Sequence, residues 1–171
     1  MTDELQNPNP IIFKSKGLNE ELIYERKQKE LDENIDDEVD NYEIFDIIKT
    51  INDPEHPLTL EQLNIVSPKN IIVNSERNHI KIYFTPTIPN CSMSTLIGLM
   101  IKVKLLNTVS SKFKVDVLIE PGKHYTEDAI NKQLNDKERV YAALESDHLK
   151  KLVNKGIKNE DEILELFSDT N

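Results

Sequence analysis

The first regular hydrophobic pattern of the chain begins near Tyr42. Apolar side chains recur there at helical spacing, at Ile44, Phe45, Ile47, Ile48 and Ile51. The pattern predicts a short helix that ends before Pro54, because a residue that precedes proline avoids helical backbone angles. The next segment, 53–59, contains two prolines and is predicted to form a rigid polar turn.

Shorter apolar runs predict strands. Segments 60–66 and 71–74 favour short strand or extended pieces, and the run 80–84 alternates apolar and polar residues with period two after a predicted turn at Asn78. The same alternation returns in 113–119. We therefore expect a small sheet built from short strands.

Between these strands the period changes to that of a helix. Within 92–106 one helix face would carry Leu96, Leu99, Met100, Val103 and Leu106, with Ile97 and Ile101 broadening it. This stretch is the clearest helix in the chain.

More helices are predicted after Pro121-Gly122 turns the chain out of the last strand. Thr126 is a candidate N-cap for a helix that runs through Leu134, with acidic residues in its first turn. Asn135 or Asp136 can start another helix, and 149–153 adds one or two turns. Residues 160–167 form either a short amphipathic helix or a frayed tail.

This order of elements predicts an α+β fold, a small mixed sheet packed by helices in a single domain. We place that domain at 41–156, after a disordered acidic tail (1–40) and before an acidic C-terminal tail or short helix (157–171). A short helix within 20–29 remains an alternative to disorder in the first tail.

Composition narrows the classes of function. The net charge is −10, and the first forty residues supply −7 of it, from twelve acidic and five basic residues. No run of Lys and Arg is dense enough for a nucleic-acid interface. With one cysteine, no apolar leader and no run long enough to cross a bilayer, we expect a protein of the cytosol, the nucleus or both, without a membrane partner.

Cys91 is the main chemical candidate. It lies in the loop 85–93, between a predicted strand and a predicted helix, and a position near a helix N-terminus favours the thiolate. The thiolate is both a nucleophile and a soft metal ligand. The alternative is a small buried residue that fills a gap.

Motifs of common enzyme classes are absent from the sequence. It has no glycine-rich phosphate loop, no HExxH and no nucleophile elbow. The four histidines are widely spaced, which argues against a structural zinc site, and we interpret His79 and His148 as solvated. Two other classes stay open: a thiol enzyme with Cys91 as nucleophile and His124 as base, and an interaction module in which Cys91 is buried and inert.

Four segments together resemble a known family. They are 53–63 (Asp-Pro-Glu-His-Pro-Leu-Thr-Leu-Glu-Gln-Leu), 84–93 (Phe-Thr-Pro-Thr-Ile-Pro-Asn-Cys-Ser-Met), 96–99 (Leu-Ile-Gly-Leu) and 131–140 (Asn-Lys-Gln-Leu-Asn-Asp-Lys-Glu-Arg-Val). In this order they are similar to the MIP-eighteen family of cytosolic iron–sulfur assembly factors, over residues 42–153. Segment 58–66 is more similar to the broadly acting branch than to the branch dedicated to iron-regulatory clients.

The resemblance implies a non-enzymatic subunit of the cytosolic iron–sulfur targeting complex. Its implied partners are a WD40 propeller protein, a HEAT-repeat scaffold and apoprotein clients. Cys91 matches the reactive cysteine of the family and would be a transient cluster ligand, with no cluster tightly bound, because protein-held clusters generally need four ligands. The preceding residue is commonly histidine in relatives but is Asn90 here, so it cannot serve as base or as an imidazole ligand.

Other residues of the motifs are candidates for function. Asp53, Glu55 and His56 belong either to a proline-fixed turn in which Asp53 caps or braces the backbone, which we favour, or to a contact with a metal or partner. Thr85 and Thr87 are expected to hydrogen-bond within the loop that presents Cys91.

Further candidates follow the last strand. His124 either reaches the edge of the sheet that carries Cys91, where its imidazolium would lower the thiol pKa, or is a solvated loop histidine. Lys132, Lys137 and Arg139 are candidates for contact with the propeller. The alternative, which is the default for charges on a helix surface, is that all three are solvated. A homodimer is also open, since a short sheet has edges that can pair.

Overall fold

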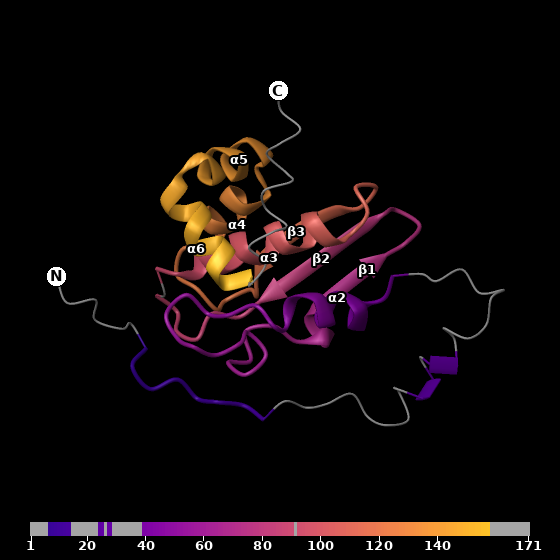
Figure 1. Cartoon of the computed structure of the whole chain (residues 1–171), viewed down its shortest axis with the longest axis horizontal. Coiled ribbons are helices and arrows are strands. Elements are labelled where there is room, and N and C mark those ends of the chain that lie inside the picture. Colours follow the sequence, from indigo (N-terminus) through magenta and orange to yellow (C-terminus); the bar gives the residue numbers. More distant parts are fainter. Residues whose placement is uncertain (1–6, 15–23, 26, 29–38, 91, 158–171) are drawn as a thin grey trace.

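The computed structural model describes residues 7–14, 24–25, 27–28, 39–90 and 92–157 (Figure 1). In chain order its elements are α2 (Asn41–Ile48), a 3₁₀ turn (Pro68–Asn70), β1 (Ile71–Asn74), β2 (His79–Phe84), α3 (Ser94–Thr108), β3 (Lys114–Ile119), α4 (Glu127–Asn135), α5 (Lys137–Glu145) and α6 (Asp147–Ile157). The α+β class and the order of elements are confirmed. None of the helices in the described ranges is long and apolar enough to span a membrane.

Parts of both predicted tails lie outside the described residues. Residues 24–25 and 27–28 are helical and fall in the predicted helix 20–29, whose remainder is not described. The predicted helix 160–167 also lies outside the described ranges. Near the N-terminus, the backbone N–H of Phe13 donates to the carbonyl of Gln62 at 2.7 Å, which ties that segment to the domain.

The sheet is mixed, as predicted, with strand order β1-β2-β3. β1 and β2 are antiparallel, and Asn78, which lies in the turn between them, has a positive φ of 48°. β2 and β3 are parallel, with Phe84 opposite Ile119, and α3 connects them. This βαβ unit brings the carboxyl ends of β2 and β3 to the same edge of the sheet.

The core lies between one face of the sheet and the helices. Ile80, Ile82 and Phe84 on β2 are fully buried, and the same alternation buries every second residue of β3. α3 contacts β3, α2, α4 and α6, and Figure 1 shows α4, α5 and α6 grouped at one end of the molecule.

The predicted helix is confirmed as α3, and the residues placed on its apolar face are buried except Leu106, but the prediction that burial is confined to one face is wrong. Buried residues lie on nearly all sides of this helix, because it has neighbours on several sides. Leu105, which we had not placed on the buried face, is fully buried, whereas Leu106 is 44% exposed.

The predicted strand or extended piece at 60–66 is also wrong, because residues 60–64 form turns and residues 65–66 belong to no strand. Thr59 and Gln62 form a reciprocal pair: the Thr59 N–H donates to Gln62 Oε1 at 2.9 Å, and the Gln62 N–H donates to Thr59 Oγ1 at 3.2 Å. This is a capping box, which starts a helical turn. Leu60 and Leu63 are consequently buried three residues apart.

The last three helices follow the prediction with two differences. Thr126 is at the N-cap of α4, but its side chain makes no capping hydrogen bond, whereas Asp136 caps α5 through the N–H groups of Glu138 and Arg139. α6 is longer than predicted. It extends to Ile157 and includes Gly156, where a Cβ would lie 2.1 Å from Met100 Sδ, so glycine allows this close packing on α3.

Candidate functional site

The loops that follow β2 and β3 lie together at the carboxyl edge of the parallel strands. The N–H of Glu120 donates to the carbonyl of Phe84 at 2.9 Å, and the N–H of Tyr125 donates to that of Pro89 at 3.1 Å. Cys91 itself lies outside the described residues, but both of its chain neighbours are described. These backbone contacts therefore join the loop after β2, which contains position 91 in the sequence, to the loop after β3.

Thr85 helps to join these loops. Its hydroxyl donates to the carboxylate of Glu120, and its N–H donates to the carbonyl of Ile65 at 2.8 Å. The expected hydrogen bond within the cysteine loop is therefore wrong for Thr85, because its partner follows β3. Thr87 is half-buried in the loop.

A hollow of about 390 Å³ lies at this edge. It is lined by Asn90, Ser92, Thr95, His124, Tyr125, Thr126 and Ile130. The expectation that His124 reaches this edge is confirmed, because His124 lines the same hollow as the two neighbours of Cys91. Tyr125, which we had not singled out, is 82% exposed beside it.

The hydrogen bonding of His124 affects the chemistry available here. Its Nδ1 accepts from the N–H of Thr126 at 3.1 Å. A neutral imidazole that accepts at Nδ1 carries its proton at Nε2, so this ring can donate toward an anion or a sulfur. The thiol-enzyme alternative would need His124 in its other neutral tautomer, with the lone pair on Nε2.

α3 begins at Ser94, two residues later than predicted. Its N-cap residue, Met93, makes no side-chain capping hydrogen bond, so no cap side chain satisfies the first N–H groups of the helix. Cys91 precedes this N-cap by two residues. The lowered pKa of the Cys91 thiol stays a prediction.

Asp53, Glu55 and His56 lie together between α2 and β1. Asp53 Oδ1 accepts from the N–H groups of Glu55 at 2.8 Å and His56 at 2.9 Å, so the predicted bracing of the turn is confirmed. Burial raises the pKa of the Asp53 carboxyl, although these two hydrogen bonds oppose the shift.

The basic candidates are all exposed. Lys132 lies on α4, and Lys137 and Arg139 lie on α5. Arg139 Nε is 3.5 Å from Asp136 Oδ2, a local ion pair on the same helix.

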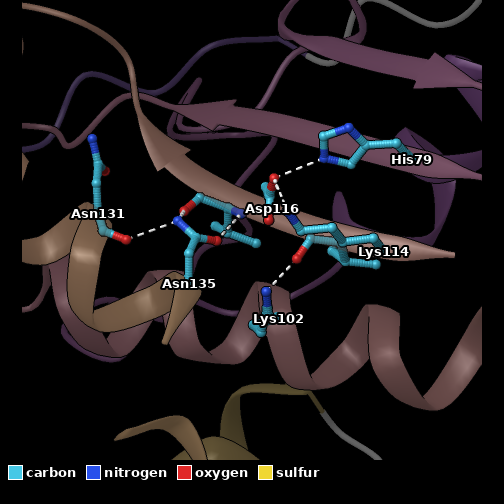
Figure 2. A network of polar contacts seen from close by, with 8 residues as sticks. His79, Lys102, Lys114, Asp116, Asn131 and Asn135 are labelled. Carbon is cyan, nitrogen blue, oxygen red and sulfur yellow. Dashed lines mark hydrogen bonds and ion pairs between the residues drawn. The ribbon is translucent and has the colours of Figure 1, made fainter. Parts of the chain in front are cut away.

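Of the two histidines predicted to be solvated, only His148 is exposed. His79 is a correction: its Nε2 lies 2.7 Å from Asp116 Oδ2, across the parallel pair of strands (Figure 2). Period-two alternation puts both residues on the same face of the sheet, but the pairing register needed to predict the contact is not visible in the sequence.

Several residues that sequence reasoning missed hold the site in place. Asn131 Oδ1 accepts from the N–H of Ile119 at 2.8 Å. Asn135 Oδ1 accepts from the N–H of Val117 at 3.0 Å, and Asn135 Nδ2 donates to the carbonyl of Val117 at 2.9 Å (Figure 2). These amides replace a neighbouring strand at the outer edge of β3. The two residues are four positions apart in one helix, a spacing that puts their side chains on the same face, and this was the signal in the sequence that could have identified them.

Gly98 has a comparable positioning role. A Cβ on this residue would lie 2.3 Å from Leu134 Cδ1, so glycine lets α4 approach α3. Gly98 and Leu134 come from two of the four motifs that carried the family resemblance. These motifs therefore maintain the packing that positions the loops.

Comparison with known proteins agrees with this arrangement. Residues 41–119 match the family model described as iron–sulfur cluster assembly protein. The chain is 53% identical over 150 residues to mouse "Cytosolic iron-sulfur assembly component 2B", covering 88% of this chain and 89% of the mouse protein. It is 52% identical over 159 residues to "MIP18 family protein galla-2" of Drosophila melanogaster, covering 92% and 97% of the two chains.

The chain belongs to the MIP18 family. A plant relative, "Protein AE7" of Arabidopsis thaliana, is 45% identical over 166 residues, covering 94% of this chain and 100% of that protein. The family resemblance seen in the four motifs is thus confirmed across nearly the whole chain.

Proposed function

We propose that this chain is a component of the cytosolic iron–sulfur targeting complex, which delivers clusters to cytosolic and nuclear apoproteins. The observation that carries the proposal is its 53% identity, over 88% of its length, to a mouse protein named as a cytosolic iron–sulfur assembly component. We assign it to the broadly acting branch, on the resemblance of segment 58–66.

In this proposal Cys91 supplies one ligand to a cluster in transit. The adjoining hollow is lined by both chain neighbours of Cys91, and the N-terminus of α3 and a donor on His124 would favour negative charge on its sulfur. One cysteine cannot complete a four-ligand site, so the other ligands come from a partner, a client or a small thiol. The protein is then an adaptor or transient carrier and not an enzyme.

The partners we propose are a WD40 propeller subunit, a HEAT-repeat scaffold and apoprotein clients. Lys132, Lys137 and Arg139 are exposed on α4 and α5, which supports a role for them in contacting the propeller. A homodimer is supported by the position of β1 at the edge of the sheet, where Ile72 is 54% exposed.

An anaerobic affinity purification from native cells tests the function. Wild type, Cys91→Ala and the exposed-surface control Lys151→Ala would be compared by mass spectrometry and by radioactive iron in the client fraction. We expect all three to recover the propeller, the scaffold and clients, with client iron lost only for Cys91→Ala. Unchanged client iron would make Cys91 dispensable, and absence of the partners from the wild type would refute the proposed complex.

Alkylation of the native protein tests the chemistry of the thiol separately. We expect iodoacetamide to modify Cys91 faster in the folded protein than in the same chain unfolded in urea at equal pH, because the folded loop favours the thiolate. Protection of Cys91 in the folded state would instead support the inert, buried cysteine of an interaction module.

A further inference from the structure

The turn between α2 and β1 places three side chains that can bind a metal around one point. A carboxylate oxygen of Asp53, a carboxylate oxygen of Glu55 and a ring nitrogen of His56 all lie within 4.8 Å of one another. The turn is rigid: Pro54 and Pro57 restrict its backbone, and the N–H of Asp53 donates to the carbonyl of Leu58 at 2.8 Å.

The ring of His56 supplies an independent observation. His56 is only 8% exposed, and its Nε2 is buried without a hydrogen-bond partner among the described residues. The nearest ion-pairing atom, Glu55 Oε2, is 3.8 Å away, which is too far for a hydrogen bond. A buried polar nitrogen without a partner is costly, so this atom calls for a ligand.

The charges of the cluster favour a divalent cation. The cluster brings two carboxyl groups and one imidazole together in a largely buried site, since Asp53 is 9% exposed and the Glu55 side chain 12%. A divalent ion bound by a neutral imidazole and both carboxylates balances the charge. It would also stabilise the ionised form of Asp53, the form that burial disfavours.

Backbone hydrogen bonds orient the carboxylate of Asp53, as metal-binding carboxylates are usually oriented. Two N–H groups fix its Oδ1, so the carboxylate orientation is set and Oδ2 is the oxygen that can bind a metal. Ligand atoms around a tetrahedral zinc ion lie roughly 3.3 Å apart, given metal bonds of about 2.0–2.1 Å. The three ligand atoms of the cluster lie up to 4.8 Å apart, so metal binding would require the side chains to rotate closer together.

From these contacts we propose that Asp53, Glu55 and His56 bind a divalent first-row transition-metal ion, such as Zn²⁺ or Fe²⁺, at a site that does not use Cys91. An imidazole nitrogen with two carboxylate oxygens suits these ions better than Ca²⁺ or Cu⁺. Three protein ligands leave at least one coordination position open, so the ion is exchangeable. This site is additional to the proposed role of Cys91 in cluster delivery.

The test uses the full chain with Cys91→Ser, so that the thiol cannot contribute. Co²⁺ is the spectroscopic probe, and Zn²⁺ is used in thermal unfolding. Glu55→Gln and His56→Gln remove one ligand each, and His148→Gln, at an exposed histidine, is the matched control. Asp53→Asn is a further variant, because an asparagine oxygen can still accept the two backbone N–H groups of the turn.

We expect Co²⁺ to give a visible d–d spectrum without a thiolate charge-transfer band in the Cys91→Ser protein and in the His148→Gln control. Glu55→Gln and His56→Gln should bind Co²⁺ more than about tenfold more weakly. Removal of a residue that only supports a metal ligand already costs about tenfold in metal affinity, so removal of a ligand itself should cost at least as much. Free Zn²⁺ at about 100 times its dissociation constant should raise Tm by roughly 5–10 °C in the parent but not in these variants.

Two results would overturn the proposal. One is absence of Co²⁺ and Zn²⁺ binding by the Cys91→Ser protein, and the other is binding by Glu55→Gln and His56→Gln that equals the control. If His56→Gln does not fold, Glu55→Gln and Asp53→Asn decide the question by the same comparison. Because activity in cluster delivery is not the readout, failure of this proposal and failure of the proposed function are distinguishable.

Discussion

At the scale of single residues, the polar cluster around Asp116 shows how the tertiary structure sets ionisation. Burial raises the pKa of Asp116, but the hydrogen bond from His79 and the charge of Lys114 together outweigh it, so the net pKa lies below the ordinary value of 3.8. Lys102, whose Nζ donates to the carbonyl of Val115, has its own pKa lowered by burial (Figure 2).

Replacement of Asp116 by asparagine should destabilise the protein in a pH-dependent manner. A carboxylate with a depressed folded-state pKa stabilises the fold above its unfolded pKa, and this contribution is lost as the pH falls through the folded value. We expect Asp116→Asn to cost about 1–2 kcal/mol near pH 5.5, and the difference to shrink toward zero below about pH 3.

Urea unfolding of wild type and variant at both pH values measures this difference. Glu76→Gln, at an exposed carboxylate in the turn between β1 and β2, is the control and should cost almost nothing. An equal loss for Asp116→Asn at the two pH values would mean that the ionised carboxylate is not the stabilising species.

At the same scale, Gly98 is required by a contact and not by its backbone angles. Gly98→Val should destabilise the protein by about 1–3 kcal/mol, because the new side chain overlaps the buried Leu134. Leu134→Ala alone should cost about 2–5 kcal/mol through the cavity that it leaves.

The double variant tests the contact itself. If Gly98→Val and Leu134→Ala compete for one space, the free energy of unfolding lost in the double variant will be clearly smaller than the sum of the two single losses. Additive losses, measured by urea unfolding, would place the effect of Gly98→Val elsewhere.

At the scale of elements, α4 supports the sheet by side-chain hydrogen bonding as well as by packing. Asn131 and Asn135 satisfy backbone groups of Val117 and Ile119, both of which are buried residues. The edge of β3 is thereby closed to further pairing, whereas β1 keeps the other edge of the sheet.

Asn135→Ala should therefore lower the free energy of unfolding by about 1–3 kcal/mol, since it leaves the Val117 N–H and carbonyl without their partner. Gln133→Ala, at an exposed position of the same helix, should be nearly neutral. Hydrogen exchange of the Val117 amide should accelerate in Asn135→Ala alone. Equal exchange in both variants would contradict the role of this asparagine.

The sequence predicted most helices and strands correctly. It failed for segment 60–66 and for the buried faces of α3. The strand alternation in 80–84 and 113–119 was sufficient because one face of the sheet is buried. Segment 60–66 was misread as extended, although the capping-box spacing of Thr59 and Gln62 was present in the sequence. The one-face pattern of α3 failed because contacts on several sides override amphipathicity.

At the scale of the whole molecule, the buried hydrophobic core runs from Ile44 to Ile157. The described hydrogen bonds include one from the N-terminal segment to this domain, from Phe13 to Gln62. The domain boundaries at 41–156 stay a prediction.

A chain restricted to residues 39–157 should consequently fold by itself. We expect a single cooperative unfolding transition in calorimetry, with Tm about 2–6 °C below that of the full chain, because the described part of the removed segments gives up one backbone hydrogen bond to the domain, from Phe13 to Gln62. Loss of cooperativity would show that the flanking residues complete the core.

The sequence by itself determined the fold class, the family and the loop that carries Cys91, because alternation, helical spacing and motif order are properties of the chain alone. Only the tertiary structure decided which loops meet: the parallel register of β2 and β3 brings His124 beside the neighbours of position 91, and it pairs His79 with Asp116. Contacts between residues far apart in the chain depend on strand register and helix packing, which local sequence does not encode.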